Sequence, residues 1–131
     1  MPITYERDDQ RRLVAVTVTE PFSVDELLGV IDRQAAEDTW AYAMFYDLRL
    51  LTTIDLDLQQ LAEHVRRVGG GRDRGPVGIA ISNRPELFRL GLKYSEMTRK
   101  IATVEMLLTA MQVDDWLARN ARRSRPDDEP S

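Results

Sequence analysis

The densest group of polar side chains in this chain lies at and after the end of an apolar run at residues 43–48, and a smaller group ends the apolar run at residues 76–82. The first group consists of Asp47, Arg49, Thr52, Thr53, Asp55 and Asp57. The second consists of Ser82, Asn83 and Arg84. If both runs are parallel strands, their carboxyl ends meet at one edge of a sheet, where open α/β sheets bind ligands. These residues are therefore the candidate surface for a partner or a ligand.

Asp47 and Arg49 stand two residues apart, so on one strand they share a face. An arginine in this position can bind a phosphate or a carboxylate through two parallel hydrogen bonds. The competing interpretation is that Asp47 accepts hydrogen bonds from the backbone or from an arginine and only holds the loop. We favour this structural interpretation.

A carboxylate could also act as a general base, and Asp55 and Asp57 are the candidates. No His or Cys stands near either of them in the sequence to complete a reactive pair. Asp57 precedes Gln60 by three residues, which is the spacing of a helix N-cap, so capping explains this carboxylate without any chemistry. The lone His64 lies on the flank of an apolar helical stripe, and we expect a surface histidine rather than a metal ligand.

The elements that position these residues follow from hydrophobic patterning and from helix capping. Residues 3–20 predict two strands around a polar turn, and the apolar runs 43–48, 76–82 and 103–109 predict three more. Capping-box spacing predicts helix starts at three places. These are Ser23 with Glu26, Asn83 with Glu86, and Thr109 with Gln112.

Two glycines have predicted roles in the helices. Gly69 is available as the left-handed terminator of the helix that follows Asp57. Gly91 is expected to let its helix approach the sheet closely. The predicted order is β-β-α-β-α-β-α-β-α, a single α/β domain with a mainly parallel five-stranded sheet, an antiparallel N-terminal hairpin and about four helices covering both faces. We expect this domain to span residues 1–120, with a flexible tail over residues 121–131.

Composition narrows the function. The chain has 131 residues, no cysteine, one histidine and a net charge of −4, so we expect no disulfide, no thiol nucleophile, no metal centre and no cofactor. Both signs of charge are interspersed, which disfavours nucleic acid as a partner. No apolar stretch approaches the length of a membrane span and the start MPITYERDD has no targeting pattern, so we expect a soluble cytoplasmic protein.

A cluster of arginines flanks the glycine-rich loop at residues 69–76. Its members are Arg66, Arg67, Arg72 and Arg74. Such a cluster can meet an anion or an acidic partner, but a solvated loop is the favoured interpretation. Trp116 has helical spacing with Val113 and is predicted to belong to the core.

The order of elements and three motifs resemble the STAS domain of anti-sigma-factor antagonists. They resemble even more the uncharacterised STAS-like bacterial proteins that are grouped with the lipid-binding CRAL-TRIO fold. The motifs are Trp40 followed by Asp47-Leu48-Arg49, the segment RGPVGIAIS and the segment VDDWL around Trp116-Leu117. The resemblance covers roughly residues 2–119 and implies a regulatory protein-interaction domain.

The antagonists carry a loop aspartate and then a Ser or Thr that a partner kinase phosphorylates. Asp47-Leu48 matches their strand end and Asp55 matches the loop aspartate, but Leu56-Asp57-Leu58 stands where Ser-Ser-Gly is expected. Thr52 and Thr53 stand earlier in the loop as substitute acceptors. The resemblance therefore implies an interaction surface that lacks the usual phosphorylation switch.

Two functions fit these observations best. The first is a non-enzymatic STAS-like domain that binds a protein partner through residues 49–57 and the first turn of the next helix. The alternative is a small-molecule or lipid-binding domain, with a pocket between the sheet and the helix that carries Leu87, Leu90, Tyr94 and Met97.

A third interpretation is an enzyme with Asp47 or Asp55 as its base, but no motif requires it. A homodimer is compatible with the fold, although no residue pattern requires one. A flat surface beside the 49–57 loop favours the protein partner, and a cavity there favours the ligand.

Overall fold

A computed structural model describes residues 3–52, 57–70, 72–81 and 84–121. Its helices and strands follow one another in the predicted order. The strands are β1 (Ile3–Asp8), β2 (Leu13–Val18), β3 (Ala43–Asp47), β4 (Val77–Ala80) and β5 (Val104–Leu107). The helices are α1 (Val24–Ala36), α2 (Leu58–Gly69), α3 (Pro85–Met97) and α4 (Ala110–Asn120).

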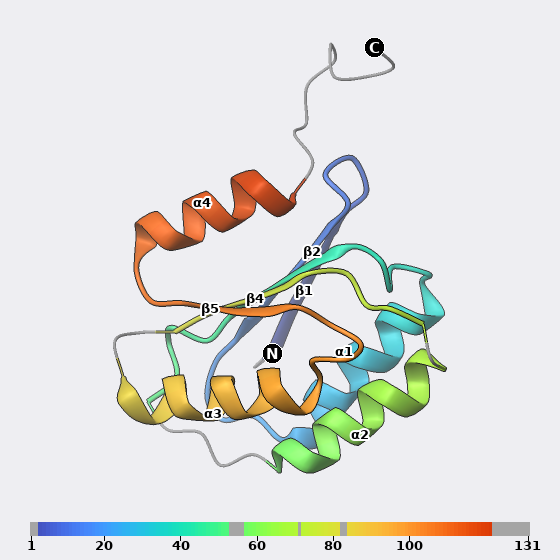
Figure 1. The fold of residues 1–131 in the computed structure, drawn as a ribbon, viewed down its shortest axis with the longest axis horizontal. Coiled ribbons are helices and arrows are strands. Elements are labelled where there is room, and N and C mark those ends of the chain that lie inside the picture. Colours follow the sequence, from blue (N-terminus) through green and yellow to red (C-terminus); the bar gives the residue numbers. More distant parts are fainter. Residues whose placement is uncertain (1–2, 53–56, 71, 82–83, 122–131) are drawn as a thin grey trace.

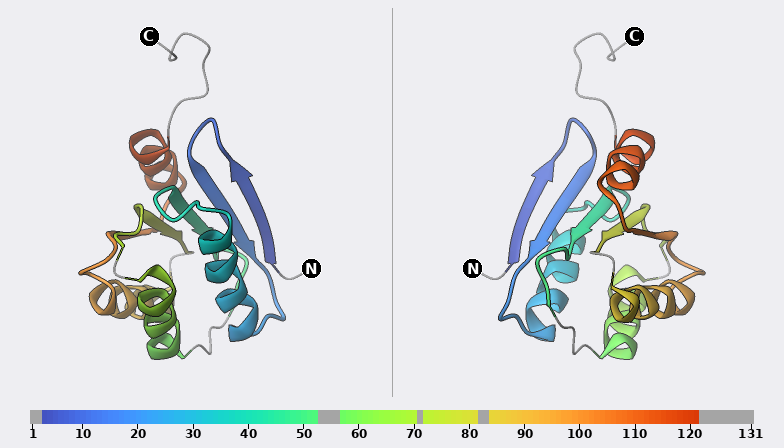
Figure 2. Two further views of the ribbon diagram at one scale, coloured as in Figure 1. Left: turned by 90° about the vertical axis from the view of Figure 1, so that its right-hand side faces the viewer. Right: turned by 90° about the vertical axis from the view of Figure 1, so that its left-hand side faces the viewer.

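The strands lie across the sheet in sequence order, from β1 to β5. The pair β1 and β2 is antiparallel and the other three pairs are parallel, as predicted. Each right-handed crossover steps to the next strand in the same direction, so the three crossover helices α1, α2 and α3 lie on one face (Figure 1). Helix α4 follows the last strand and covers the other face (Figure 2). Both faces of the sheet are thus covered by helices.

The core has two parts, one on each face of the sheet. The larger part lies under the three crossover helices and includes the fully buried side chains of Val16 and Met44. The smaller part lies under α4, where the rings of Trp116 and Phe45 have centroids 6.2 Å apart. A Cβ at Gly78 would stand 2.7 Å from Cε2 of Trp116, so this glycine is needed for the ring to lie on the sheet. The prediction that Trp116 belongs to the core is confirmed.

Local capping signals are confirmed at three helix starts. Ser23 and Thr109 each form a complete capping box with the residue three positions later. Asp57 is the N-cap of α2, and its Oδ1 accepts from the amide of Gln60 at 3.1 Å. These signals are readable from sequence because both partners lie within one helical turn.

The start of α3 differs from the prediction by one residue. Arg84, rather than Asn83, is its N-cap, with φ −127° and ψ 113°, and it makes no side-chain capping bond. An Asn83 cap would require helical dihedrals at Arg84, and the ring of Pro85 disfavours them for the residue before it. Pro85 therefore sets the boundary as the first residue of the helix.

The end of α2 also differs by one residue. Gly69 is the last residue of the helix, and it is Gly70 that adopts the left-handed conformation, with φ 58°. Gly69 is needed for another reason, since a Cβ there would stand 2.7 Å from the ring of Trp40. Trp40 is buried, and its ring occupies the space that a side chain at position 69 would need.

Candidate functional site

Asp47 and Arg49 interact with each other at the carboxyl edge of the sheet. Nε and Nη2 of Arg49 each lie 2.9 Å from a carboxylate oxygen of Asp47, and the Arg49 amide also donates to Asp47 Oδ1 at 3.1 Å. The hydrogen bonds from Arg49 hold the pKa of Asp47 below its usual value, and the same pair raises the pKa of Arg49. The structural interpretation of Asp47 is confirmed, because it closes the turn that leaves β3.

The other candidate residues are engaged in holding the same edge. Thr52 Oγ1 donates to the carboxylate of Glu20 at 2.9 Å, and Arg84 Nη1 donates to the carbonyl of Leu51 at 2.7 Å. Asp57 caps α2, as described above. The remaining candidates lie outside the described residues. These are Thr53, Asp55, Ser82 and Asn83.

His64 links two helices. Its Nε2 lies 2.8 Å from Oδ1 of Asp32 in α1, and its Nδ1 lies 2.7 Å from Nη2 of Arg67. Arginine can only donate, so Nδ1 accepts and Nε2 carries the proton that is donated to Asp32. Both ring nitrogens are occupied by these partners, so His64 serves as a helix-to-helix contact. Among the described residues no cluster of three or more His, Asp or Glu side chains is placed to hold a metal ion.

An apolar cavity of about 90 Å³ lies between the sheet and the three crossover helices. Leu48 and Leu51, from the loop after β3, form part of its wall, so the loop at the strand ends borders a cavity. The rest of the wall comes from the strands, helices and loops around the cavity. It includes Val18, Phe22, Leu58, Leu61, Ile79 and Ile81. This is the edge of the sheet at which the topology predicts a ligand.

The predicted pocket residues on α3 are largely confirmed. Leu87, Leu90 and Tyr94 line the cavity, and Met97 does not. Met97 is the last residue of α3, and its carbonyl accepts from Arg66 Nη1 at 3.1 Å. Gly91 takes part instead, together with Met106 of β5. A Cβ at Gly91 would collide with the end of the Met106 side chain, which confirms that this glycine permits the close approach of α3 to the sheet.

Arg74 lies beside this cavity, and the prediction that it belongs to a solvated loop is wrong. The residue is only 7% exposed. Its amide donates to the carbonyl of Ile101 at 2.7 Å, and the next amide, Gly75, donates to the carbonyl of Trp40 at 2.9 Å. These backbone bonds fix the segment before β4 between two neighbouring loops, and the side chain enters the interior. No pattern in the local sequence distinguishes it from the other arginines of the cluster.

The guanidinium of Arg74 meets dipoles and aromatic rings. Nη2 donates to Oε1 of Gln34 at 2.5 Å and to the hydroxyl of Tyr46 at 3.0 Å, and the group lies 5.2 Å from the ring centroid of Trp40. It also interacts with the hydroxyl of Tyr94. Nε has no hydrogen-bond partner, and no carboxylate of the described residues pairs with this cation. A buried positive charge thus stands without a negative one in this part of the chain.

Tyr94 and Tyr46 connect Arg74 to the cavity, because both line it and both interact with the guanidinium. Burial raises the pKa of Tyr94, and the charge of Arg74 opposes this rise. Burial also lowers the pKa of Arg74, but the two tyrosine hydroxyls outweigh this effect and the net pKa lies above the usual value. The side of the cavity formed by these tyrosines is therefore next to a fully charged arginine.

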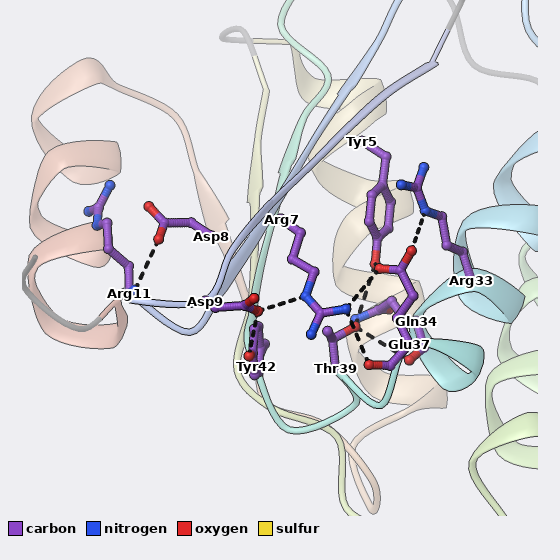
Figure 3. Close-up of polar contacts among 10 residues, drawn as sticks. All are labelled: Tyr5, Arg7, Asp8, Asp9, Arg11, Arg33, Gln34, Glu37, Thr39 and Tyr42. Atoms are coloured by element: carbon purple, nitrogen blue, oxygen red, sulfur yellow. Dashed lines mark hydrogen bonds and ion pairs between the residues drawn. The ribbon is translucent and has the colours of Figure 1, made fainter.

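A second polar cluster lies at the amino edge of the sheet and joins the N-terminal hairpin to the end of α1 (Figure 3). Arg7 Nε and the Tyr42 hydroxyl donate to Oδ1 of Asp9 at 2.6 and 2.7 Å. Arg33 Nε donates to Oε2 of Glu37 at 2.9 Å. Hydrogen bonds from Arg7 and Arg33 lower the pKa values of Asp9 and Glu37 respectively. The carboxylates of this cluster are paired, which indicates a structural tie.

A surface hollow of about 520 Å³ opens beside this cluster, lined by arginines and by the rings of Trp40 and Tyr42. It is larger than the apolar cavity, but its wall is polar and of mixed charge, because Asp38 and Asp73 share it with the arginines. Arg12 and Arg72 lie over the two rings, 4.8 Å from the Tyr42 centroid and 5.6 Å from the Trp40 centroid. The apolar cavity is the better candidate, because ligand pockets are lined mainly by apolar and aromatic side chains and its lining is almost wholly of this kind.

Comparisons with protein-family models, with curated proteins and with solved structures give no match to this chain. The STAS-like resemblance therefore stays a prediction from the sequence. Among the described helices, none is both long enough and apolar enough to cross a bilayer.

Proposed function

We propose that this protein binds a small ligand with an apolar portion in the cavity between the sheet and helices α1, α2 and α3. The observation that carries the proposal is the cavity itself, which lies at the carboxyl edge of the strands and is bordered by Leu48 and Leu51 of the loop. Burying apolar ligand atoms against leucine and isoleucine side chains supplies the affinity, at about 25 cal/mol per Å² of apolar surface.

The cavity volume limits the size of the ligand portion. An apolar cavity of about 150 Å³ holds one benzene molecule. By the same ratio, the volume of about 90 Å³ seen here suits an apolar portion of about three or four heavy atoms, unless side chains move. Met106 is the side chain best suited to move, because it has three rotatable side-chain bonds and lies against Gly91.

The proposal is tested by titrating the full chain with 1-butanol, whose four carbon atoms match the cavity volume, and following methyl resonances by NMR. We expect saturable shifts confined to the leucine and isoleucine methyls of the cavity. Gly91→Ala should weaken binding by about tenfold, because Met106 must move into the cavity to admit the new methyl group. Gly29→Ala is the matched control, since a Cβ there has no atom within 4 Å, and its affinity should equal that of the parent. Shifts spread over the surface, or no saturation, would contradict the proposal.

The second candidate is the STAS-like regulatory domain that binds a protein partner. One observation favours it: the side chains of Leu50 and Met111 are 65% and 81% exposed. The charge of Asp114 acts on Arg49, so the loop after β3 and the first turns of α4 belong to one surface. Exposed apolar side chains next to charged ones are typical of a contact surface.

This second candidate is tested by a pull-down from a lysate of the source cells. Leu50→Ser and Met111→Ser should each remove the same captured protein. Leu92→Ser, which alters a side chain that is 47% exposed on α3, should not. Retention of that protein by both variants would rule out this surface.

A further inference from the structure

We infer that the ligand of this cavity is a short-chain monocarboxylate, whose carboxylate is bound by the hydroxyls of Tyr46 and Tyr94 next to the guanidinium of Arg74. This inference rests on the proposed function, because it names the chemistry of the ligand for the same cavity. It assigns to Arg74 the role of the positive charge that selects an anion.

The first step is the unbalanced charge of Arg74. The residue is 7% exposed, and its partners in the described residues are the amide oxygen of Gln34, two hydroxyls and the ring of Trp40. Removing a charge from water costs several kcal/mol, and dipoles offset this cost only in part. An anion brought to this place meets a guanidinium that is already desolvated, so binding does not have to remove water from the cation.

The second step is the direction of the hydrogen bonds. Arginine can only donate, so the Tyr46 hydroxyl accepts from Nη2 at 3.0 Å. Among the described residues, no hydrogen bond gives the O–H proton of Tyr46 an acceptor. The hydroxyl of Tyr94 also interacts with the guanidinium, which makes it the second candidate donor. A hydroxyl polarised by a cation is a stronger donor, and two such donors match the two oxygens of a carboxylate.

The third step is the position of the tyrosines. Both line the cavity, while Arg74 does not. A ligand whose chain lies against Leu87 and Ile79 can therefore reach the hydroxyls without displacing the arginine. The volume of about 90 Å³ limits the apolar chain to about three or four carbon atoms.

The test compares butanoate with butanamide, its uncharged match in size, by calorimetric titration of the full chain at pH 7. We expect butanoate to bind at least tenfold more tightly, because hydrogen bonds to a charged group are stronger than those to a neutral one. If butanamide binds as tightly as butanoate or more tightly, the inference is overturned while the proposed function stands. If neither compound nor 1-butanol binds, both fail.

Two conservative variants locate the carboxylate. Tyr46→Phe and Tyr94→Phe keep the rings that line the cavity and remove only the hydroxyls. Each should lower the affinity for butanoate by about tenfold and leave the affinity for 1-butanol within about twofold of the parent. Tyr42→Phe is the matched control, because its hydroxyl donates to Asp9 at the opposite edge. Unchanged butanoate affinity in both cavity variants would overturn the inference.

Discussion

Arg49 binds Asp47 at two points, with Nε and Nη2 each 2.9 Å from a carboxylate oxygen. Only one residue separates them, so their side chains bind each other directly where the chain leaves β3. An anion that approaches Arg49 must therefore compete with Asp47. This is the physical reason why we place the ligand in the cavity behind the loop and not on the loop itself.

The Asp47–Arg49 pair predicts a stability that depends on pH. The pKa of Asp47 is lower in the folded state than in the unfolded state. The stability that the ionised carboxylate contributes is therefore fully present above the unfolded pKa of about 3.9, and it is lost as the pH falls through the folded pKa. Asp47→Asn should lower the free energy of unfolding by about 1 kcal/mol at pH 7. The difference between variant and parent should shrink below about pH 4, as measured by urea denaturation.

The control for this measurement is Asp73→Asn. Asp73 is exposed and forms no ion pair within the described part of the chain, so its replacement should change stability little at either pH. A loss at pH 7 that persisted unchanged at pH 3 would show that Asp47 acts through packing and not through its charge.

The packing of Trp116 on Gly78 predicts opposite effects at two glycines. Gly78→Ala places a methyl group against a rigid ring in a filled core and should destabilise the protein by about 2 kcal/mol. Gly29→Ala, at an exposed position in α1 with open space around it, should stabilise the protein by about 0.5 to 1 kcal/mol. Thermal unfolding of the two variants beside the parent measures both effects, and a common sign would contradict the packing described for Trp116.

The N-cap role of Asp57 predicts a difference between two substitutions. Asp57→Ala removes the acceptor for the Gln60 amide and should cost about 1 kcal/mol of stability. Asp57→Asn keeps an acceptor of similar capping strength and should stay close to the parent. Chemical denaturation distinguishes them, and equal losses in both variants would mean that the charge, not the cap, is what matters at this position.

The contact between His64 and Asp32 predicts an energetic coupling between α1 and α2. A double-mutant cycle with His64→Ala and Asp32→Ala should give a coupling energy of about 0.5 to 1.5 kcal/mol, because the two side chains share one hydrogen bond of 2.8 Å. Neither variant should change the affinity for 1-butanol, since neither residue lines the cavity. Additive losses would indicate that the two side chains do not interact in solution.

The sequence by itself determined the order of elements and most helix boundaries. Ser23, Asp57 and Thr109 each bond to a group three residues away, so their roles could be read within a single turn. The parallel sheet followed from alternating strands and helices together with the handedness of crossovers. The boundary error at Asn83 arose because Pro85 disfavours helical dihedrals at Arg84. At Gly69 the error arose because two adjacent glycines give the same local signal, and Gly70 is the one that adopts the left-handed conformation.

Only the tertiary structure decided which arginine is buried and where a cavity remains. Arg74 meets Gln34, Tyr46 and Tyr94 from three different parts of the chain, and the Gln34 contact spans 40 residues. The cavity likewise depends on how side chains from four strands, three helices and the loops between them fill the space under the sheet. Local propensity acts over a few residues, whereas burial and unfilled volume depend on all the segments that meet at one place.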